Sequence, residues 1–438
     1  SASAVVEAER HAARVDFRTV GDYYEVADQT TGEANVTIAG ALIVNKLNAG
    51  SYMFKRVIGA APDGSYGPAN TLEYLGLELP EWGDHQTNYV LDPWSRIKTL
   101  ANVNRWVFNP DRPSGSGQAL SSLYENYFTG YGTSTANWKF APGLGERVGD
   151  WYRIGYTKEN TVSKTEQSPY INTGVVFKAV YVPKKYIAYN PATGNNTEQA
   201  GADGNAFTFF SFGDVIYGSI EAAMTAFSGN GTNVVTYNFA GKTWGDVKAL
   251  AEGMKKNDPT GYNRYLNRQL KDKDTASKLT EAEAALLDWN NYMYATFGYS
   301  TNTDGTPAIN LNGKDTRRLL ARYALHTYAN GICYYTHWIR HSNNNHPSKG
   351  IMEYAIVRNN VYKLHIRNIH GLGKDIPYEP PFDPDPEDPD EPTPPDPPGP
   401  DEPNKPDNPD NPDDPDLNIE IEVIVKPWEG LPDETLYF

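Results

Sequence analysis

Apolar residues occur along this chain in short segments that are rich in β-branched and aromatic side chains and that end at Gly, Asn, Asp or Pro. Such segments are typical of β-strands. The first two are separated by a glycine-containing turn and are expected to form a hairpin. Many short strands with long intervening segments predict an antiparallel β-sandwich. The predicted strands cover residues 14–17, 22–26, 36–47, 52–57, 152–156, 174–182, 207–216, 234–239, 332–339 and 355–369.

Residues 244–297 have a helical period instead of the strand pattern. Thr280 and Glu283 form a capping box, in which two side chains satisfy free backbone N–H groups at the start of a helix. Four apolar residues follow at spacings of three and four and predict one apolar stripe. They are Leu286, Trp289, Met293 and Phe297. We therefore expect a helical insertion that lies on the β framework.

The segment 58–150 is rich in Gly, Pro, Asn and aromatic residues. Aromatic residues are scarce in disordered chains, so long ordered loops are expected here. The tryptophans of this segment are Trp82, Trp94, Trp106 and Trp138.

Residues 377–416 contain 17 of the 32 prolines, 15 acidic residues and one lysine. Proline has no backbone N–H to donate, and neighbouring carboxylates repel one another, so an extended polyproline conformation is favoured. At about 3.1 Å per residue, such a segment reaches on the order of 120 Å. We predict a stiff acidic linker.

An amphipathic strand is predicted directly after the linker. In an extended chain one face carries Ile419, Ile421, Val423 and Val425, and the other carries Glu420, Glu422, Ile424 and Lys426. Pro427 and Trp428 end the alternation. An unpaired strand with an apolar face aggregates in water, so this strand needs a sheet edge or a groove. It either completes its own sandwich or inserts into another subunit.

Charge is distributed unequally between these segments. The chain has a net charge of -16, of which residues 377–416 carry -14 and residues 417–438 carry -4, so the first 376 residues carry +2. A nearly neutral body without a basic run argues against nucleic acid and anionic membranes as partners.

The candidate chemistry is sparse. Cys333 is the only cysteine, which excludes an intrachain disulfide, a cysteine-based zinc site and an iron–sulfur cluster, and its apolar surroundings predict burial. His337 and His341 have the i, i+4 spacing of a helical metal site, but their surroundings are typical of a strand. A strand places them about 13 Å apart at roughly 3.3 Å per residue. We therefore predict no metal site and no cofactor.

No catalytic motif emerges from the sequence, which has no nucleophile elbow, no phosphate-binding glycine loop and no HExxH sequence. We therefore expect a structural protein and not an enzyme. The alternative is an extracellular carbohydrate-binding or glycoside-degrading protein that uses the aromatic loops, with Trp82 and Trp106 as the residues to test.

Three C-terminal segments, 332–339, 357–366 and 421–428, resemble the Mfa-type fimbrillins, the shaft subunits of type V pili in Bacteroidia. Their order and the Asp/Pro/Asn-rich linker before the last segment also match the family. The most specific part is the run with Arg358, Asn359, Asn360 and Tyr362, together with the terminal strand. Segments at 13–17, 45–52 and 170–184 resemble upstream strands of the family.

The resemblance implies a two-domain β-sandwich pilin that is exported as a lipoprotein to the cell surface and trimmed after an arginine. The candidate cleavage sites are Arg10, Arg14 and Arg18. Subunits of this family polymerise when the C-terminal strand of one subunit fills a groove in the next. The donor strand here would carry Ile419, Ile421, Val423, Val425 and Trp428. The implied partners are identical subunits in a homopolymer, minor tip and anchor pilins, and host or bacterial surface ligands.

One segment stands at an unusual place for the family. The segment that resembles residues 9–17 lies well inside family chains, after most of the N-terminal domain, and here it begins the sequence. We therefore expect this chain to lack the domain with the acceptor groove. The expected parts are residues 1–20 as the end of an N-terminal domain or a leading strand, 21–376 as a sandwich, 377–416 as a linker and 417–438 as a donor strand.

Overall fold

The computed structural model of the chain describes its strands and helices with the loops between them. The described residues are 12–28, 32–47, 146–160, 172–201, 204–213, 215–229, 232–256, 258–297, 299–301, 307–309, 324–341, 353–375 and 418–428, with short strands at 56–58, 73–74, 89–90 and 107–108. The predicted loop tryptophans, Arg10 and the linker at 377–416 lie outside these residues.

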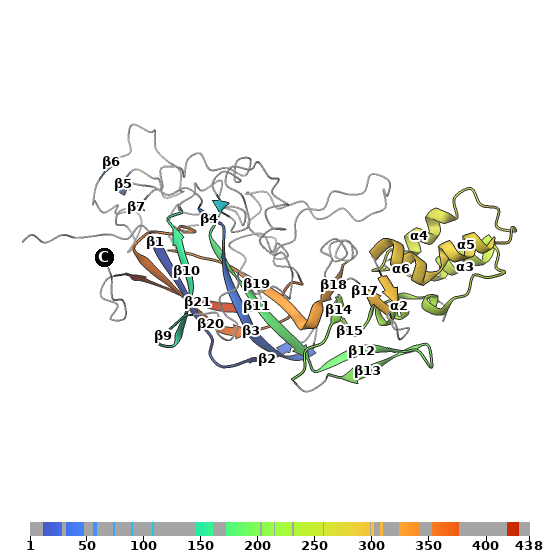
Figure 1. Cartoon of the computed structure of the whole chain (residues 1–438), viewed down its shortest axis with the longest axis horizontal. Coiled ribbons are helices and arrows are strands. Elements are labelled where there is room, and N and C mark those ends of the chain that lie inside the picture. Colours follow the sequence, from blue (N-terminus) through green and yellow to red (C-terminus); the bar gives the residue numbers. More distant parts are fainter. Residues whose placement is uncertain are drawn as a thin grey trace, which may run out of the picture.

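A five-stranded sheet, called the first sheet here, contains both the first and the last described strands of the chain (Figure 1). Strand β1 pairs in parallel with β20, and the other neighbours are antiparallel. The order is β21 (Ile419–Pro427), β20 (Asn360–Ile369), β1 (Ala12–Arg18), β10 (Trp151–Lys158) and β9 (Glu146–Val148).

The second sheet is antiparallel throughout. Its order is β19 (Ile332–Trp338), β11 (Gly174–Pro183), β3 (Gly32–Val44) and β2 (Tyr24–Asp28). The predicted hairpin between the first two strands is therefore wrong, because β1 and β2 belong to different sheets. The turn between them carries the chain across the core, where each strand finds another partner.

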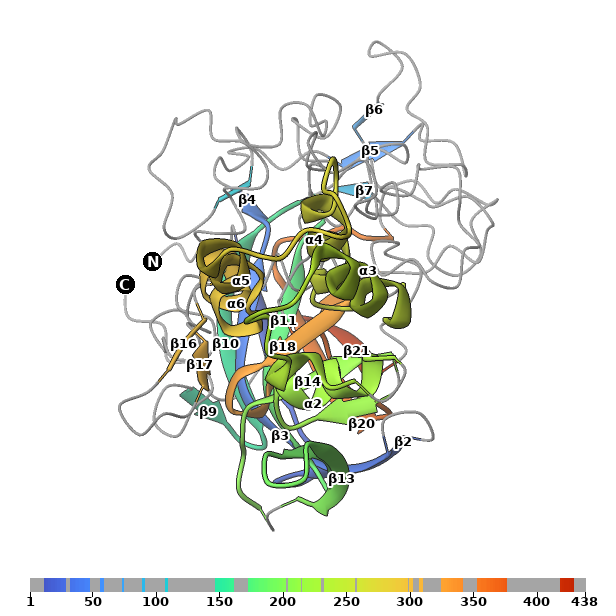
Figure 2. The same ribbon diagram turned by 90° about the vertical axis from the view of Figure 1, so that its right-hand side faces the viewer.

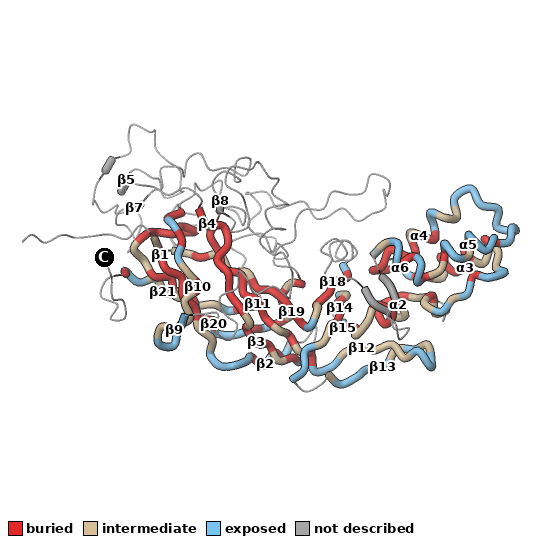
Figure 3. The backbone as a smooth tube through the Cα atoms, in the orientation of Figure 1, coloured by how far each residue is buried: buried red, intermediate tan, exposed pale blue. Residues whose placement is uncertain are grey.

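The two sheets pack face to face around one hydrophobic core, which confirms the predicted β-sandwich (Figure 3). Phe17 of β1 meets Phe177 of β11 edge to face, with ring centroids 5.5 Å apart. The Tyr24 hydroxyl of β2 donates a hydrogen bond of 2.9 Å to the carbonyl oxygen of Ile366 in β20. Apolar contacts and a buried hydrogen bond thus join the sheets.

A lobe with its own sheet is inserted between the neighbouring strands β11 and β19. The order in this sheet is β13 (Asn195–Ala200), β12 (Lys185–Asn190), β15 (Val215–Tyr217), β14 (Phe209–Phe212) and β18 (Leu325–Tyr328). The lobe also contains α2 (Ile220–Phe227), η5 (Val234–Thr236), α3 (Trp244–Gly253), α4 (Tyr262–Gln269), α5 (Glu281–Leu287) and α6 (Trp289–Phe297). The turn η6 (Ala329–Gly331) leads back to β19.

The helices of this lobe surround a second hydrophobic core and gather at one end of the molecule (Figures 1 and 2). The predicted helical stretch is thus helical, and it lies beyond the sandwich. Seven further short strands pair locally. They are β4 (Lys46–Leu47), β5 (Arg56–Ile58), β6 (Glu73–Tyr74), β7 (Tyr89–Val90), β8 (Val107–Phe108), β16 (Tyr299–Thr301) and β17 (Pro307–Ile309), with β4 on β8, β6 and β7 on β5, and β16 on β17.

Two local predictions in the lobe need correction. The Thr280 capping box is present, but α5 ends at Leu287 and a new helix begins at Trp289. The prediction of one helix with a single apolar stripe is therefore wrong. Leu286 is 55% exposed, whereas Leu287 is buried. The strand predicted at 234–239 is also wrong, because the Asn233 side chain accepts a hydrogen bond from Val235 N and begins a short 3₁₀ helix.

Candidate subunit interface

The C-terminal strand β21 lies at the edge of the first sheet and pairs antiparallel with β20 of the same chain. Val423 stands opposite Leu364, and Val425 stands opposite Tyr362. Ile419 is buried, and Ile421, Val423 and Val425 are partly buried against the sandwich core. The predicted alternation is present, and of the two alternatives left open by the sequence, the single chain adopts the one in which the strand completes its own sandwich.

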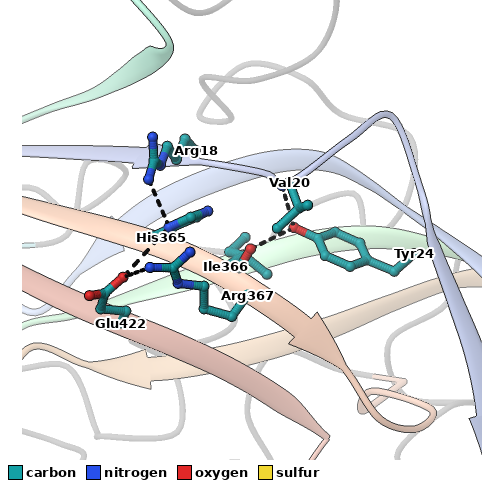
Figure 4. A network of polar contacts seen from close by, with 7 residues as sticks. All are labelled: Arg18, Val20, Tyr24, His365, Ile366, Arg367 and Glu422. Carbon is teal, nitrogen blue, oxygen red and sulfur yellow. Dashed lines mark hydrogen bonds and ion pairs between the residues drawn. The ribbon is translucent and has the colours of Figure 1, made fainter.

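The outward face of β21 is tied to β20 through Glu422 (Figure 4). Its carboxylate accepts a hydrogen bond from the Arg367 guanidinium and lies 3.6 Å from Nδ1 of His365. The Arg18 guanidinium donates to the same Nδ1 over 3.0 Å, which requires a neutral imidazole. Burial, Arg18 and Arg367 lower the pKa of His365, and Glu422 opposes this shift.

Trp428 anchors the end of β21. Its ring is buried and stacks on Tyr156 of β10 at a centroid distance of 5.6 Å, and the Arg14 guanidinium lies 5.8 Å from its centre. Its backbone N donates to the Asn359 carbonyl oxygen over 2.9 Å. Trp428 therefore connects β21 to strands beyond its direct partner.

The run from Arg358 to Tyr362 leads into β20, and we call it the corner. Trp428 is held against it by the hydrogen bond to Asn359. Arg358 Nε lies 2.6 Å from Glu159 Oε2, and both side chains are buried. Asn359 has a left-handed backbone with φ of 58°, and its N donates to the Ala12 carbonyl oxygen over 3.0 Å. Asn360 donates its side-chain amide to the carbonyl oxygens of Val357 and Arg358. The corner thus joins β20 to β1, β21 and the segment after β10.

Tyr362 completes this corner from inside the core. Its hydroxyl accepts a hydrogen bond from Val357 N over 2.8 Å and lies 2.8 Å from Nδ1 of His341. Burial raises the pKa of Tyr362 well above its ordinary value. The phenol therefore stays neutral and can donate to the imidazole while it accepts from the backbone, so its role here is structural.

Two of the three candidate cleavage sites lie inside a central strand. Arg14 and Arg18 belong to β1, which is bonded on both sides. Arg14 is buried and pairs with Asp16 over 2.8 Å. Burial raises the pKa of Asp16, and Arg14 opposes this shift. A protease reaches the backbone at Arg14 only after β1 has left the sheet, whereas Arg18 is the last residue of the strand and, among the described residues, pairs only with His365 of β20.

The other residues singled out in the sequence have packing roles. Cys333 is buried in β19, as predicted. His341 lies beside Tyr362, with ring centroids 5.9 Å apart. His337 has a ring Nε2 that is buried without a hydrogen-bond partner in the described structure, and burial lowers its pKa to about 4.

Three residues that pack at this site were missed from the sequence. Tyr156, Glu159 and Trp151 come from or directly follow β10, far from the C-terminal segment in the chain. Trp151 lies 6.2 Å from His365 between ring centroids. The pattern within a single strand carries no signal for such cross-sheet contacts.

Comparison with known families agrees with this site. Residues 326–432 match the family described as major fimbrial subunit protein type IV, fimbrillin, C-terminal, a match that extends from β18 to β21. It supports a structural subunit of a cell-surface fimbria built from identical subunits. A search of curated proteins found no match. In the described part of the chain, every helix is too short or too polar to cross a lipid bilayer.

Proposed function

We propose that this protein is a repeating stalk subunit of an adhesive fimbria and that its subunits join by exchange of β21. The family match at the C-terminal end supports the structural role. By resemblance, the fimbria is a type V pilus of the Mfa type, the precursor is a lipoprotein exported to the outer membrane, and minor tip and anchor pilins are its partners. Surface ligands of the host or of other bacteria would be bound by the assembled fibre.

The length of the connection between β20 and β21 is the observation that carries the exchange proposal. The two strands are antiparallel neighbours, and Ile369 stands opposite Ile419. A hairpin joins such ends with about two to five residues. Here residues 370–418 intervene, and their acidic proline-rich part reaches on the order of 120 Å when extended. A linker of this reach is unnecessary within one sandwich and sufficient to span to a neighbour.

Exchange would preserve the contacts of the single chain. The β21 strand of a neighbour would pair with the vacated edge of β20 and place its Trp428 on Tyr156, as the chain's own strand does. An exchanged element of this kind makes the same contacts in monomer and polymer, so concentration and linker length decide the balance. Each subunit would remain a complete sandwich in the fibre.

The edge of β20 gives a physical reason why it should always be paired with a strand. Without β21, the backbone N–H and C=O groups of β20 and the apolar side of Leu364 would face water. Open edges of this kind pair with other chains. A subunit that has given up its strand would therefore capture the strand of the next subunit.

A cross-strand disulfide tests the exchange. Lys363 and Ile424 are directly opposed, at positions where Cα atoms are close enough to be bridged by cysteines. Lys363→Cys/Ile424→Cys monomers oxidised before assembly should form no filaments in negative stain, and reduction should restore them. The same variant oxidised after assembly should yield a ladder of covalent multimers in non-reducing gels.

The two single-cysteine variants are the matched controls, since native Cys333 is buried. They should assemble normally under both conditions. Filaments that form from the pre-oxidised double variant, or oxidised filaments that run as monomers, would refute exchange of β21 while leaving the fimbrial role intact.

A further inference from the structure

Basic side chains surround one indole ring on the outer face of the first sheet. The Arg18 guanidinium lies 4.7 Å and the Lys363 ammonium 4.8 Å from the ring centre of Trp151. The His365 ring lies edge-on to the same indole. Arg367 pairs with Glu422, the carboxylate that also lies near His365. We call Arg18, Lys363, Arg367 and Trp151 the basic patch, which the buried, neutral imidazole of His365 adjoins.

Positive charge in this patch is incompletely balanced. Among the described residues, neither Arg18 nor Lys363 has a carboxylate within ion-pair distance. Glu422 is engaged by Arg367 and lies near His365, and Asp16 is buried against Arg14. Burial lowers the pKa of Lys363, Asp16 opposes this shift, and the nearby Lys426, Arg14 and Arg18 add to it. The patch has the charge and the aromatic surface to receive an anionic segment.

The chain itself contains such a segment. Residues 377–416 carry -14 with proline at every second or third position. Polyproline segments bind aromatic surfaces at low entropic cost because their conformation is already formed, and carboxylates pair with arginine and lysine. The charge of the linker and the polyproline conformation that its sequence favours therefore both complement the basic patch.

The point at which the linker joins β21 lies within reach of this patch. Ile419 begins β21 directly after Asn418, whose carbonyl oxygen accepts a hydrogen bond from His370 N over 2.8 Å. The same end of the sheet carries Arg18, which stands opposite His365, and Arg367. Glu422, which stands opposite His365, is four residues along β21 from Asn418, so the acidic segment before Asn418 is tethered about 13 Å from this level of the sheet at roughly 3.3 Å per residue.

We propose that the basic patch is a docking site for the acidic proline-rich segment at residues 407–416. In a fibre this segment belongs to the neighbour that supplies β21, a detail that rests on the proposed exchange. Docking fixes the linker against the acceptor sheet and makes subunit contact partly electrostatic. About five extended residues span 15 Å at roughly 3.1 Å each, which is enough to cross three strands at about 4.8 Å spacing.

A labelled peptide of residues 401–417 tests the docking. Its binding is measured by fluorescence anisotropy on a full-length chain in which every acidic residue of 377–416 is changed to asparagine, so that its own linker does not compete. We expect saturable binding that weakens at least tenfold between 50 and 500 mM salt. Lys363→Gln, and separately Arg18→Gln, should weaken binding several-fold.

Controls separate the patch from unspecific attraction. Lys185→Gln, on the inserted lobe, should leave binding unchanged, and circular dichroism checks that every variant folds. Absence of peptide binding, equal binding of the asparagine form of the peptide, or equal binding of a polyglutamate of the same charge would each overturn the proposal. The disulfide ladder is measured separately, so failure of docking and failure of strand exchange are distinguishable.

Discussion

Trp428 stacks on Tyr156 with ring planes 8° from parallel and centroids 5.6 Å apart. The strands β20 and β1 lie between β21 and β10 in the sheet order. One aromatic pair therefore joins the edge strand to the fourth strand across the outer surface of the first sheet. In our proposal a neighbour's strand makes the same contact when it is seated.

Replacing Trp428 by alanine should loosen β21. Loss of a buried tryptophan costs about 3–5 kcal/mol in protein cores, and we expect the effect mainly on the attachment of this strand. Hydrogen exchange should accelerate at the β21 amides and change little in β11. Trp428→Phe keeps an aromatic ring on Tyr156, so its exchange rates in β21 should lie between those of the alanine variant and those of the native chain. Unchanged exchange in the alanine variant would contradict the anchoring role.

A charge on the inward face of β21 should prevent assembly, and the same charge on its outward face should not. Val423→Asp places a carboxylate against the core beside Leu364, whereas Ile424→Asp places it opposite Lys363. An unpaired carboxylate in an apolar site is strongly unfavourable. Filament yield in negative stain should fall at least tenfold for Val423→Asp and stay near native for Ile424→Asp. Equal yields would mean that the inward and outward faces of β21 are not distinguished by burial against the core of the sandwich.

Breaking the buried pair of Arg358 and Glu159 should destabilise the corner that holds Trp428. Removal of one partner leaves an uncompensated buried charge and costs about 3–5 kcal/mol. The urea midpoint should therefore drop for Arg358→Met and for Glu159→Leu. The double variant should recover much of the loss, because neither charge remains. A double variant that loses the sum of both single effects would argue against direct coupling.

Acidification should weaken the fold through His337. Its pKa is about 4 in the folded chain and about 6.5 when unfolded, so the unfolded chain binds the proton first as pH falls. This contribution to stability is complete above pH 6.5 and is lost down to about pH 4, by at most about 3 kcal/mol. His337→Asn should flatten the dependence of the urea midpoint between pH 7.5 and 4.5. An unchanged slope would assign the acid sensitivity to other groups.

The capping box at the start of α5 should stabilise only the inserted lobe. The Thr280 side chain accepts from Glu283 N, and the Glu283 carboxylate accepts from Thr280 N over 3.0 Å. Thr280→Ala should cost about 1 kcal/mol. Hydrogen exchange should report the loss in α5 and α6, with β20 as the internal control. Faster exchange in β20 would mean that lobe and sandwich unfold as one unit.

Much of the secondary structure could be read from the chain because its signals are local. β-Branched runs marked β11, β19 and β20, and the Thr280 and Glu283 pair marked the start of α5. Errors arose where side chains compete locally. Asn233 caps a 3₁₀ turn within a strand-like run, and Asp288 accepts from the N–H groups of Asn290 and Asn291 where one helix was expected to continue.

The candidate interface likewise has features that local sequence patterns predict and features that only the structure explains. The alternation from Ile419 to Val425 fixed which face of the strand is apolar, because side chains of any extended strand alternate. The run from Arg358 to Tyr362 was found by resemblance, without a reason for its residues. The structure supplies that reason, since Asn359 bonds both to Ala12 and to Trp428.

The amino-acid sequence by itself determined the apolar face of the last strand, the acidic linker before it and the position of the helices, because each depends on neighbours a few residues apart. Only the tertiary structure decided that β21 lies on β20, that β1 lies between β10 and β20 and is parallel to β20, and that Trp428 meets Tyr156. Those contacts join residues at least 50 positions apart, and they exist because two sheets must close over one core before an edge is left for the last strand.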